Sequence, residues 1–397
     1  MKAGRLLAIF AIILPAFTYG IYRFSVGVLV PTMESVLSVR DATAGAIVSV
    51  SVGMVGLGVI GSGYLSRRFG DLRVILAGLV IFAAAMGTIA IVEGLVEFAI
   101  LFSLGSFGSG LVITPSYGVA ASLFPKRMGF AASYVSAGYN FAGYIGPPAT
   151  SYLLVAHGWD APFLMFAAVG LVFFAVVLGI LGRGAPSASG TGLQSFTSLL
   201  RIRAVRVLSL GVFFADLGFL VYLSWAPKFL ALNFGGGANA TTTLDSVFGF
   251  GLGLGAMGTL AGGGLYDKIG GKKSAVIAAI LPAFALLGTY LANSFAMVVV
   301  FVLLTGVLGN IFWPLITAMC QESVPVKDRT AATSVVQTAG FVGAFIGPGL
   351  AGIAGGPVAP VLAITSAAPY FVLALIVGIF YVNPARSAET TTLTSAH

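Results

Sequence analysis

Two ionisable residues lie within long apolar stretches of this chain, where a charge is most costly. Arg23 lies in the run that ends at Pro31, and Asp216 lies in the middle of another run. A charge in hydrocarbon costs about 2.5–3.5 kcal/mol on insertion scales, so such residues mark functional sites by default. The planar fork of arginine suits a carboxylate, and a desolvated carboxyl readily holds a proton. We therefore predict that Arg23 binds an organic anion and that Asp216 carries a proton.

Both residues also have a purely structural interpretation. Arg23 is eight residues, about 12 Å, below Pro31 at the outer end of its helix, so its side chain can extend part of the way to water. Asp216 is about 15 Å from the cytoplasmic end of its helix, where a protonated, hydrogen-bonded aspartate can serve packing alone. Position 223 is the repeat equivalent of Arg23, which places Asp216 about 10 Å deeper. A direct ion pair is expected to be strained, and a bridging substrate or water chain is expected instead.

Uncharged polar side chains in the apolar runs are the remaining ligand candidates. Tyr19 lies one turn from Arg23 on the same helix face. An amide without a partner is costly in hydrocarbon, which favours Asn140 and Asn310. Each candidate has hydrogen bonding between helices as its alternative role. The predicted substrate-binding residues are Arg23, Tyr19, Asn140, Tyr144, Asn310, Trp313 and Gln337.

The composition requires a membrane protein. Hydrophobic residues make up 58% of the 397 residues and charged residues 8%, against about 45–50% and about 25% in globular domains. Uncharged runs of about 20 residues, long enough to cross the hydrocarbon, recur along the chain. The first run lacks a cleavage site and is predicted to be a retained helix rather than a signal peptide. We predict an all-α membrane protein of twelve helices, at residues 6–30, 42–65, 73–92, 98–122, 129–155, 161–182, 207–231, 243–265, 274–292, 296–320, 331–354 and 360–382.

Basic residues are concentrated in the loops on one side of these helices. Seventeen of the twenty lysines and arginines lie there, and the positive-inside rule then places both termini in the cytoplasm. The predicted location is the cell (plasma or inner) membrane. The net charge of +8 follows from this topology and requires no nucleic-acid partner. The opposite loops are expected to hold the charges Glu34, Arg40, Asp41, Glu93, Glu97, Asp160, Lys228 and Asp245.

The chain repeats itself at an offset of 200 residues. The loops 63–73 and 263–273 share two glycine positions and two basic positions, namely Gly63/Gly263, Gly70/Gly270, Arg68/Lys268 and Arg73/Lys273. The offset spans six helices, so the halves have one orientation and form a parallel repeat, an architecture known in transporters. The expected divisions are a six-helix bundle at 1–182, a linker at 183–206, a second bundle at 207–383 and a disordered tail at 384–397. Within the linker, residues 193–203 are predicted to form either an amphipathic interfacial helix or an irregular basic loop.

These loops resemble the signature of the major facilitator superfamily. The second copy matches the signature in full, at Gly263, Asp267, Lys268, Gly270, Lys272 and Lys273. The first copy departs from it, with Arg67 at the acidic position and Asp71 at a basic one, among Gly63, Arg68 and Gly70. In the family, the acid is thought to cap a helix of the opposite half and hold the inner gate shut. A cation is disfavoured at a helix N-terminus, so the resemblance implies an inner latch that rests mainly on Asp267. The alternative is that Arg67 and Asp71 are solvated topology charges.

Small residues and prolines are expected to shape the helices rather than do chemistry. Glycines in an apolar helix allow close packing, and this role is predicted for Gly251, Gly253, Gly255 and Gly258. Pro115 and Pro314 occupy near-equivalent positions in the two halves, and a proline there is expected to kink its helix.

The sequence contains no hydrolytic triad, nucleotide-binding loop or metal signature. The single cysteine excludes a cysteine metal cluster, and the two scattered histidines add no metal signature. We therefore predict a monomeric secondary transporter without a cofactor and without enzyme activity, which moves a small organic anion with protons by alternating access. The alternative is a proton-driven antiporter that exports lipophilic or cationic compounds, since Gly143–Pro147 resembles the antiporter signature and Asp216 would attract a cation. A non-transporting receptor would need neither gating glycines nor a midplane acid.

Overall fold

A computed structural model describes residues 11–123, 128–182, 196–325 and 329–382. Over these residues the chain is helical and forms no strand. The predicted tail and most of the predicted linker lie outside the described residues, and α8 (Phe196–Leu199) is a single turn. The N-terminal half contains α2 (Ile13–Val36), α3 (Asp41–Phe69), α4 (Asp71–Ile89), α5 (Leu95–Leu123), α6 (Met128–His157) and α7 (Ala161–Leu181). The C-terminal half contains α9 (Arg203–Phe234), α10 (Ala238–Ile269), α11 (Gly271–Leu291), α12 (Phe295–Gly309), α13 (Phe312–Glu322), α14 (Arg329–Ile353), α15 (Ala359–Leu362), the π-helical turn η2 (Ala363–Ala367) and α16 (Ala368–Phe380).

The helices have the length and apolarity of membrane spans. Within the described residues, eleven segments are long and apolar enough to cross a bilayer. Helix α6, which corresponds to the predicted span 129–155, has the length but is not among the eleven. It carries an asparagine, several tyrosines and two adjacent prolines, which lower its apolarity. The predicted multi-pass, all-α architecture is confirmed.

The repeat is visible in the backbone. Gly70 and Gly270 each lie between two helices and adopt positive φ angles of 88° and 81°. A positive φ is accessible to glycine without a steric penalty, so both signature loops turn in the same way. One predicted kink is a true break: the span 296–320 is divided into α12 and α13 at Asn310 and Ile311, just before Pro314. Helix α5 continues through Pro115.

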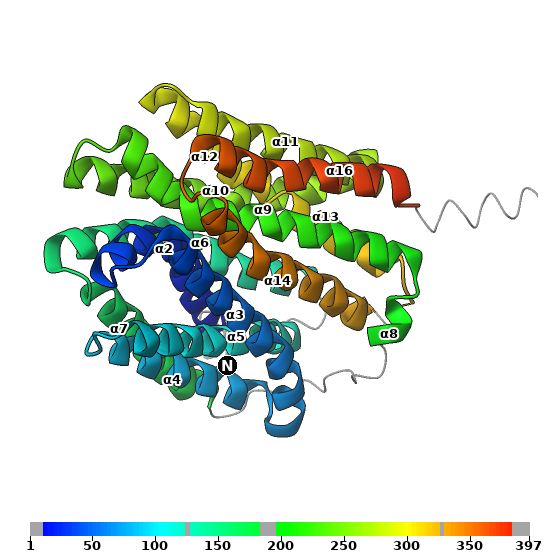
Figure 1. Ribbon diagram of the computed structural model, residues 1–397. Helices are drawn as coiled ribbons and strands as arrows, with labels where there is room; N and C mark the ends of the chain where they lie inside the picture. Colours follow the sequence, from blue (N-terminus) through cyan, green and yellow to red (C-terminus); the bar gives the residue numbers. More distant parts are fainter. Residues whose placement is uncertain (1–10, 124–127, 183–195, 326–328, 383–397) are drawn as a thin grey trace, which may run out of the picture.

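The two halves pack against each other mainly through α3 with α14, α6 with α10, and α2 with α9 (Figure 1). We name the end where α2 finishes and α3 begins the outer end, following the charge-based prediction. Contacts between the halves extend from mid-helix to this end. Gly45 of α3, for example, lies against the Pro348 carbonyl of α14, and Gly27 of α2 lies against the Leu223 carbonyl of α9.

Glycines allow the close approach of these helices, as predicted. A Cβ at Gly251, Gly255 or Gly258 would lie within 2.9 Å of an atom of α12 or of Asn310, so these three glycines pack α10 inside its own half. Gly253 faces the opposite half, where a Cβ would meet the Tyr144 ring at 2.5 Å. The packing role predicted for these glycines is confirmed.

The structure corrects the predicted environment of three charged residues. Glu34, Lys228 and Asp245, which were expected in outer loops, lie inside α2, α9 and α10. Lys228 and Asp245 already fall near the outer ends of the predicted spans 207–231 and 243–265, and Glu34 lies in α2 because this helix continues six residues past the predicted limit at residue 30. Arg23 and Asp216 are therefore accompanied by other ionisable residues within the helices.

Candidate functional site

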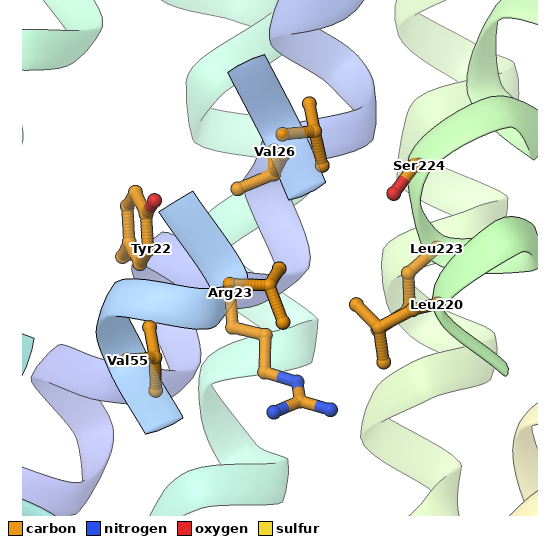
Figure 2. A pocket seen from close by; sticks show the side chains of 9 residues that line it. Tyr22, Arg23, Val26, Val55, Leu220, Leu223 and Ser224 are labelled. Carbon is orange, nitrogen blue, oxygen red and sulfur yellow. The ribbon is translucent and has the colours of Figure 1, made fainter. Parts of the chain in front are cut away.

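The centre of the seam between the halves is formed by α2 and α9. Arg23 projects from α2 toward α9, where Leu220 and Leu223 face it (Figure 2). Its guanidinium Nη1 donates a hydrogen bond to the hydroxyl of Tyr19, one turn earlier in the helix. Side chains of a helix lean toward its N-terminus, so Arg23 extends away from Pro31 and the outer water. The structural interpretation in which Arg23 reaches for the outer interface is therefore wrong for this conformation.

Arg23 and Asp216 lie close together. The distance from Arg23 Nη2 to Asp216 Oδ1 is 3.7 Å, and only 12% and 8% of the two side chains are exposed. A direct ion pair was expected to be strained, and the two groups do meet, but at a distance longer than a hydrogen bond. The long arginine side chain runs toward the N-terminal end of α2, and this direction brings its guanidinium to the depth of Asp216.

The ion pair leaves hydrogen-bonding capacity unused. A distance of 3.7 Å exceeds the usual 2.7–3.2 Å of an N–H···O bond. Arg23 Nε and Asp216 Oδ1 are both buried and have no hydrogen-bond partner. Buried polar atoms are normally satisfied. The site therefore holds a donor and an acceptor that a ligand group can use.

Two residues that the sequence did not single out complete the site. The Tyr139 ring of α6 stacks on Tyr19, with centroids 5.3 Å apart, and Arg23 lies 5.6 Å from the centroid of the Tyr19 ring. On the other side, a Cβ at Gly340 of α14 would lie 2.2 Å from Asp216 Oδ2. The Tyr139 ring forms an aromatic wall of the site, and the absence of a side chain at Gly340 leaves room for the Asp216 carboxylate.

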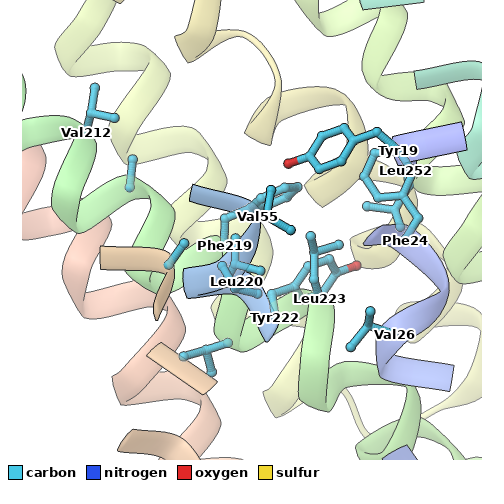
Figure 3. Packing of buried hydrophobic residues seen from close by; sticks show 14 of the residues in the cluster. Tyr19, Phe24, Val26, Val55, Val212, Phe219, Leu220, Tyr222, Leu223 and Leu252 are labelled. Atoms are coloured by element: carbon cyan, nitrogen blue, oxygen red, sulfur yellow. The ribbon is translucent and has the colours of Figure 1, made fainter. Parts of the chain in front are cut away.

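The site is closed toward the outer end. A cavity of about 10 Å³, roughly the space of one water-sized sphere, lies beside Arg23 and reaches Ser224. Its other walls are apolar. Figure 3 shows Val26, Val55, Leu220 and Leu223 packed together at this level. Access to Arg23 from the outer end therefore requires the two halves to separate.

The other predicted ligands are dispersed. Asn140 of α6 is 3% exposed and its Oδ1 has no hydrogen-bond partner, so it keeps capacity for a ligand. Asn310 donates from Nδ2 to the Gly306 carbonyl at 2.9 Å, one turn earlier at the end of α12, which is a bond within one helix and not the bond between helices that was its alternative role. Tyr144 packs against Phe250 at 5.1 Å between ring centroids, on the seam between α6 and α10.

Two further candidates lie on the C-terminal half. Trp313 is the second residue of α13, with its ring 6.2 Å from that of Phe312. Gln337 is exposed on α14, three residues before Gly340. Residues three apart share a helix face, so Gln337 is on the side of α14 that meets Asp216.

The signature loops are only partly described. The side chains of Arg67, Gly263 and Asp267 lie outside the described residues, so the predicted latch stays a prediction. Asp71 is 5% exposed at the start of α4, and a Cβ at Gly118 of α5 would lie 2.8 Å from its Oδ2. It is therefore not the solvated charge of the alternative interpretation.

An ionic cluster joins the halves at the outer end. Lys228 of α9 forms ion pairs with both Glu34 of α2 and Asp41 of α3. Its ammonium also lies 5.7 Å from the centroid of the Trp225 ring, and the Trp225 indole donates to the Pro348 carbonyl of α14 at 3.0 Å. Sequence alone assigned these charges to separate loops because their pairing depends on tertiary contacts.

Comparisons with known proteins agree with this architecture. The sequence profile described as Major Facilitator Superfamily matches residues 12–292 and 208–396. A putative metabolite transport protein of Haemophilus influenzae is 26% identical over 381 residues, which cover 86% of this chain and 88% of that protein. The cis,cis-muconate transport protein of Acinetobacter baylyi is 22% identical over 372 residues, which cover 88% and 87%. The crystal structure of a D-xylose–proton symporter superposes with a TM-score of 0.75 at 17% identity, over 95% of this chain and 98% of that one.

The family match therefore covers nearly the whole chain, and the all-helical fold of the described residues agrees with it. The chain belongs to the major facilitator superfamily and is a multi-pass secondary transporter rather than an enzyme.

Proposed function

We propose that this transporter moves a small organic anion together with a proton by alternating access. The observation that carries the proposal is the incompletely bonded Arg23–Asp216 pair at 3.7 Å, whose Nε and Oδ1 have no hydrogen-bond partner. Arginine presents a planar fork that matches a carboxylate. Arg23 binds the anion, and Asp216 is its competitor for the guanidinium.

Charge balance explains why the proton and the anion move together. With no substrate bound, the positive Arg23 and the negative Asp216 cancel. An anion added to this pair leaves one uncompensated negative charge in a buried site, which is costly. Protonation of Asp216 removes the competing charge and releases Arg23 for one carboxylate group of the substrate, so Arg23 and that carboxylate again balance each other. The transporter is therefore expected to change between its outward-open and inward-open states more readily when the site is empty or holds both the anion and the proton than when it holds only one of them.

The relatives give this proposal a chemical direction. One is named as a transporter of cis,cis-muconate, a dicarboxylate, and a structural neighbour is named as a proton symporter. Carboxylates and proton coupling are therefore the first properties to test. The aromatic wall of Tyr19 and Tyr139 suits a ligand with a flat or unsaturated body.

The test is uptake into proteoliposomes under an imposed pH gradient, with a carboxylate panel that starts with cis,cis-muconate. We expect uptake that depends on the gradient and is lost in R23A. R23K keeps the charge but not the fork and is expected to keep part of the activity. Gradient-driven export of lipophilic cations without uptake of any carboxylate would instead support the antiporter alternative.

We also propose that an inner latch rests mainly on Asp267. The first signature loop has Arg67 at the corresponding position, and a cation is disfavoured at the partly positive N-terminus of a helix. D267N is therefore expected to change the uptake rate more than R67E does. Equal effects of the two substitutions would contradict the proposal.

A further inference from the structure

A second buried carboxylate lies apart from the Arg23–Asp216 pair. Asp245 is the eighth residue of α10, about 10 Å along the helix from its outer start. It is only 4% exposed, and it accepts a hydrogen bond from Ser151 of α6. Asp245 and Ser151 belong to opposite halves of the transporter.

Asp245 has no cationic partner among the described residues. The ion pairs of this part of the chain are Arg23–Asp216, Lys228–Glu34 and Lys228–Asp41. An isolated buried carboxylate is costly and is normally neutralised by a partner or by uptake of a proton. One hydrogen bond from a serine supplies no charge, so the neutralising charge has to come from a ligand.

The space for such a ligand is beside the carboxylate. A cavity of about 240 Å³ lies between α2, α6, α9 and α10. The polar side chains that line it, those of Thr32, Ser151, Thr241 and Asp245, carry oxygen and no nitrogen, and its remaining lining residues are the apolar Val28, Pro31, Leu154, Val155, Pro227 and Ala231. Oxygen ligands suit hard cations. A single carboxylate cancels one positive charge, whereas a divalent ion would leave the site charged.

We infer that Asp245 is the centre of a monovalent-cation site, filled by a proton or by an alkali cation. Because Asp245 lies where α10 of one half packs against α6 of the other, the occupancy of this site affects whether the two halves stay together at the outer end. One turn further along α10, a Cβ at Gly249 would lie 2.7 Å from the Gly143 carbonyl of α6, so α6 and α10 are closely packed just below the site. A neutralised Asp245 is compatible with this dry contact, while a bare carboxylate draws in water and favours separation of the halves.

The other titratable groups near this end do not neutralise Asp245. On the neighbouring helices these are Glu34 of α2, Asp41 of α3 and Lys228 of α9, which form their own ion pairs, and His157 at the exposed end of α6. The experiment therefore compares variants that keep all of them.

The test measures the melting temperature of the purified full-length protein. One series compares sodium, potassium and choline chloride at equal ionic strength, and a second varies the pH in choline chloride alone. A ligand that binds only the folded state raises the melting temperature with its concentration. A rise with sodium or potassium identifies an alkali cation, and a rise only with falling pH identifies a proton. In either case we expect D245N, which removes the charge with little change of shape, to lose that response.

D160N provides the matched control, because it removes an exposed acid at the same end and is expected to behave as wild type. S151A keeps the carboxylate but removes its hydrogen-bond donor, so the midpoint of the response is expected to move, and this variant tests the site even if D245N does not fold. A wild-type protein that responds to neither series, or a D245N protein that responds like wild type, would overturn the inference. Loss of the Asp245 response with anion uptake still dependent on Arg23 would separate this site from the proposed transport site.

Discussion

Replacing Lys228 by methionine is expected to weaken the closed outer end of the transporter. Lys228 is the shared partner of Glu34 and Asp41, and methionine leaves these two carboxylates near each other without a counter-charge. The exposed fractions of the three side chains are 14%, 12% and 34%. The cluster is therefore intermediate between a surface pair and a fully buried one.

The expected free-energy cost of K228M lies between the values for a buried and for an exposed ion pair. Removing one partner from a buried ion pair costs about 3–5 kcal/mol, and an exposed pair is worth about 0–1 kcal/mol. For this partly buried cluster we expect a cost of about 2–3 kcal/mol. When the halves separate at the outer end, the carboxylates meet water and the cost is relieved. The population of the outwardly open state should therefore rise by about 30- to 150-fold, at 1.4 kcal/mol for each factor of ten.

A cysteine reporter measures this population. The only native cysteine, Cys320, is buried and can be replaced by alanine. Ser224 is 1% exposed and lines the small cavity beside Arg23, so S224C should react with a membrane-impermeant maleimide added outside only when the outer end opens. We expect labelling in K228M to be faster than in the parent by about the same 30- to 150-fold factor, because the open population limits the rate.

R40M is the matched control, since it removes a positive charge from an exposed residue at the same end. It should leave the labelling rate close to that of the parent. If K228M and R40M label at the same rate, the cluster does not hold the outer end closed and the reasoning fails.

Two further substitutions test packing at the site and in the bundle. In G340A, the new Cβ would lie 2.2 Å from Asp216 Oδ2, so the carboxylate has to move. Misplacing a reacting group by about 1 Å can cost about 100-fold, and we expect gradient-driven anion uptake to fall by about tenfold or more, with folding checked by the melting temperature. In G306A, the Cβ would lie 1.8 Å from the Gly251 carbonyl oxygen. Overpacking of this kind costs about 1–3 kcal/mol, so the melting temperature should fall. In G61A, where nothing lies within 4 Å, the melting temperature should not fall.

The sequence predicts the fold well because the signals for it are local. Helix length and apolarity are properties of continuous segments, and the repeated loops at Gly70 and Gly270 identify the two halves. Pro314 marks a break for the same reason, since a proline cannot donate the hydrogen bond of its own turn.

The contacts of the site depend on tertiary geometry, and the sequence does not predict them correctly. The estimate of depth places Asp216 below Arg23 but ignores the direction of the arginine side chain, which closes the gap. Tyr139 is next to the chosen Asn140, and no local signal indicates which of the two faces Arg23. Asp245 is assigned to a loop because charged residues usually end a span, whereas the structure buries it between the halves.

The central claim is that Asp216 and the transported anion compete for Arg23. The most direct test is the affinity of the purified protein for a carboxylate as a function of pH, with cis,cis-muconate as the first probe, in wild type and D216N. One linked proton changes the binding constant by up to about tenfold per pH unit, so we predict that wild-type affinity rises with falling pH. In D216N, the neutral amide stands in for the protonated acid, and binding should be tight and independent of pH. The same pH dependence in both proteins, or loss of binding in D216N, would contradict the account.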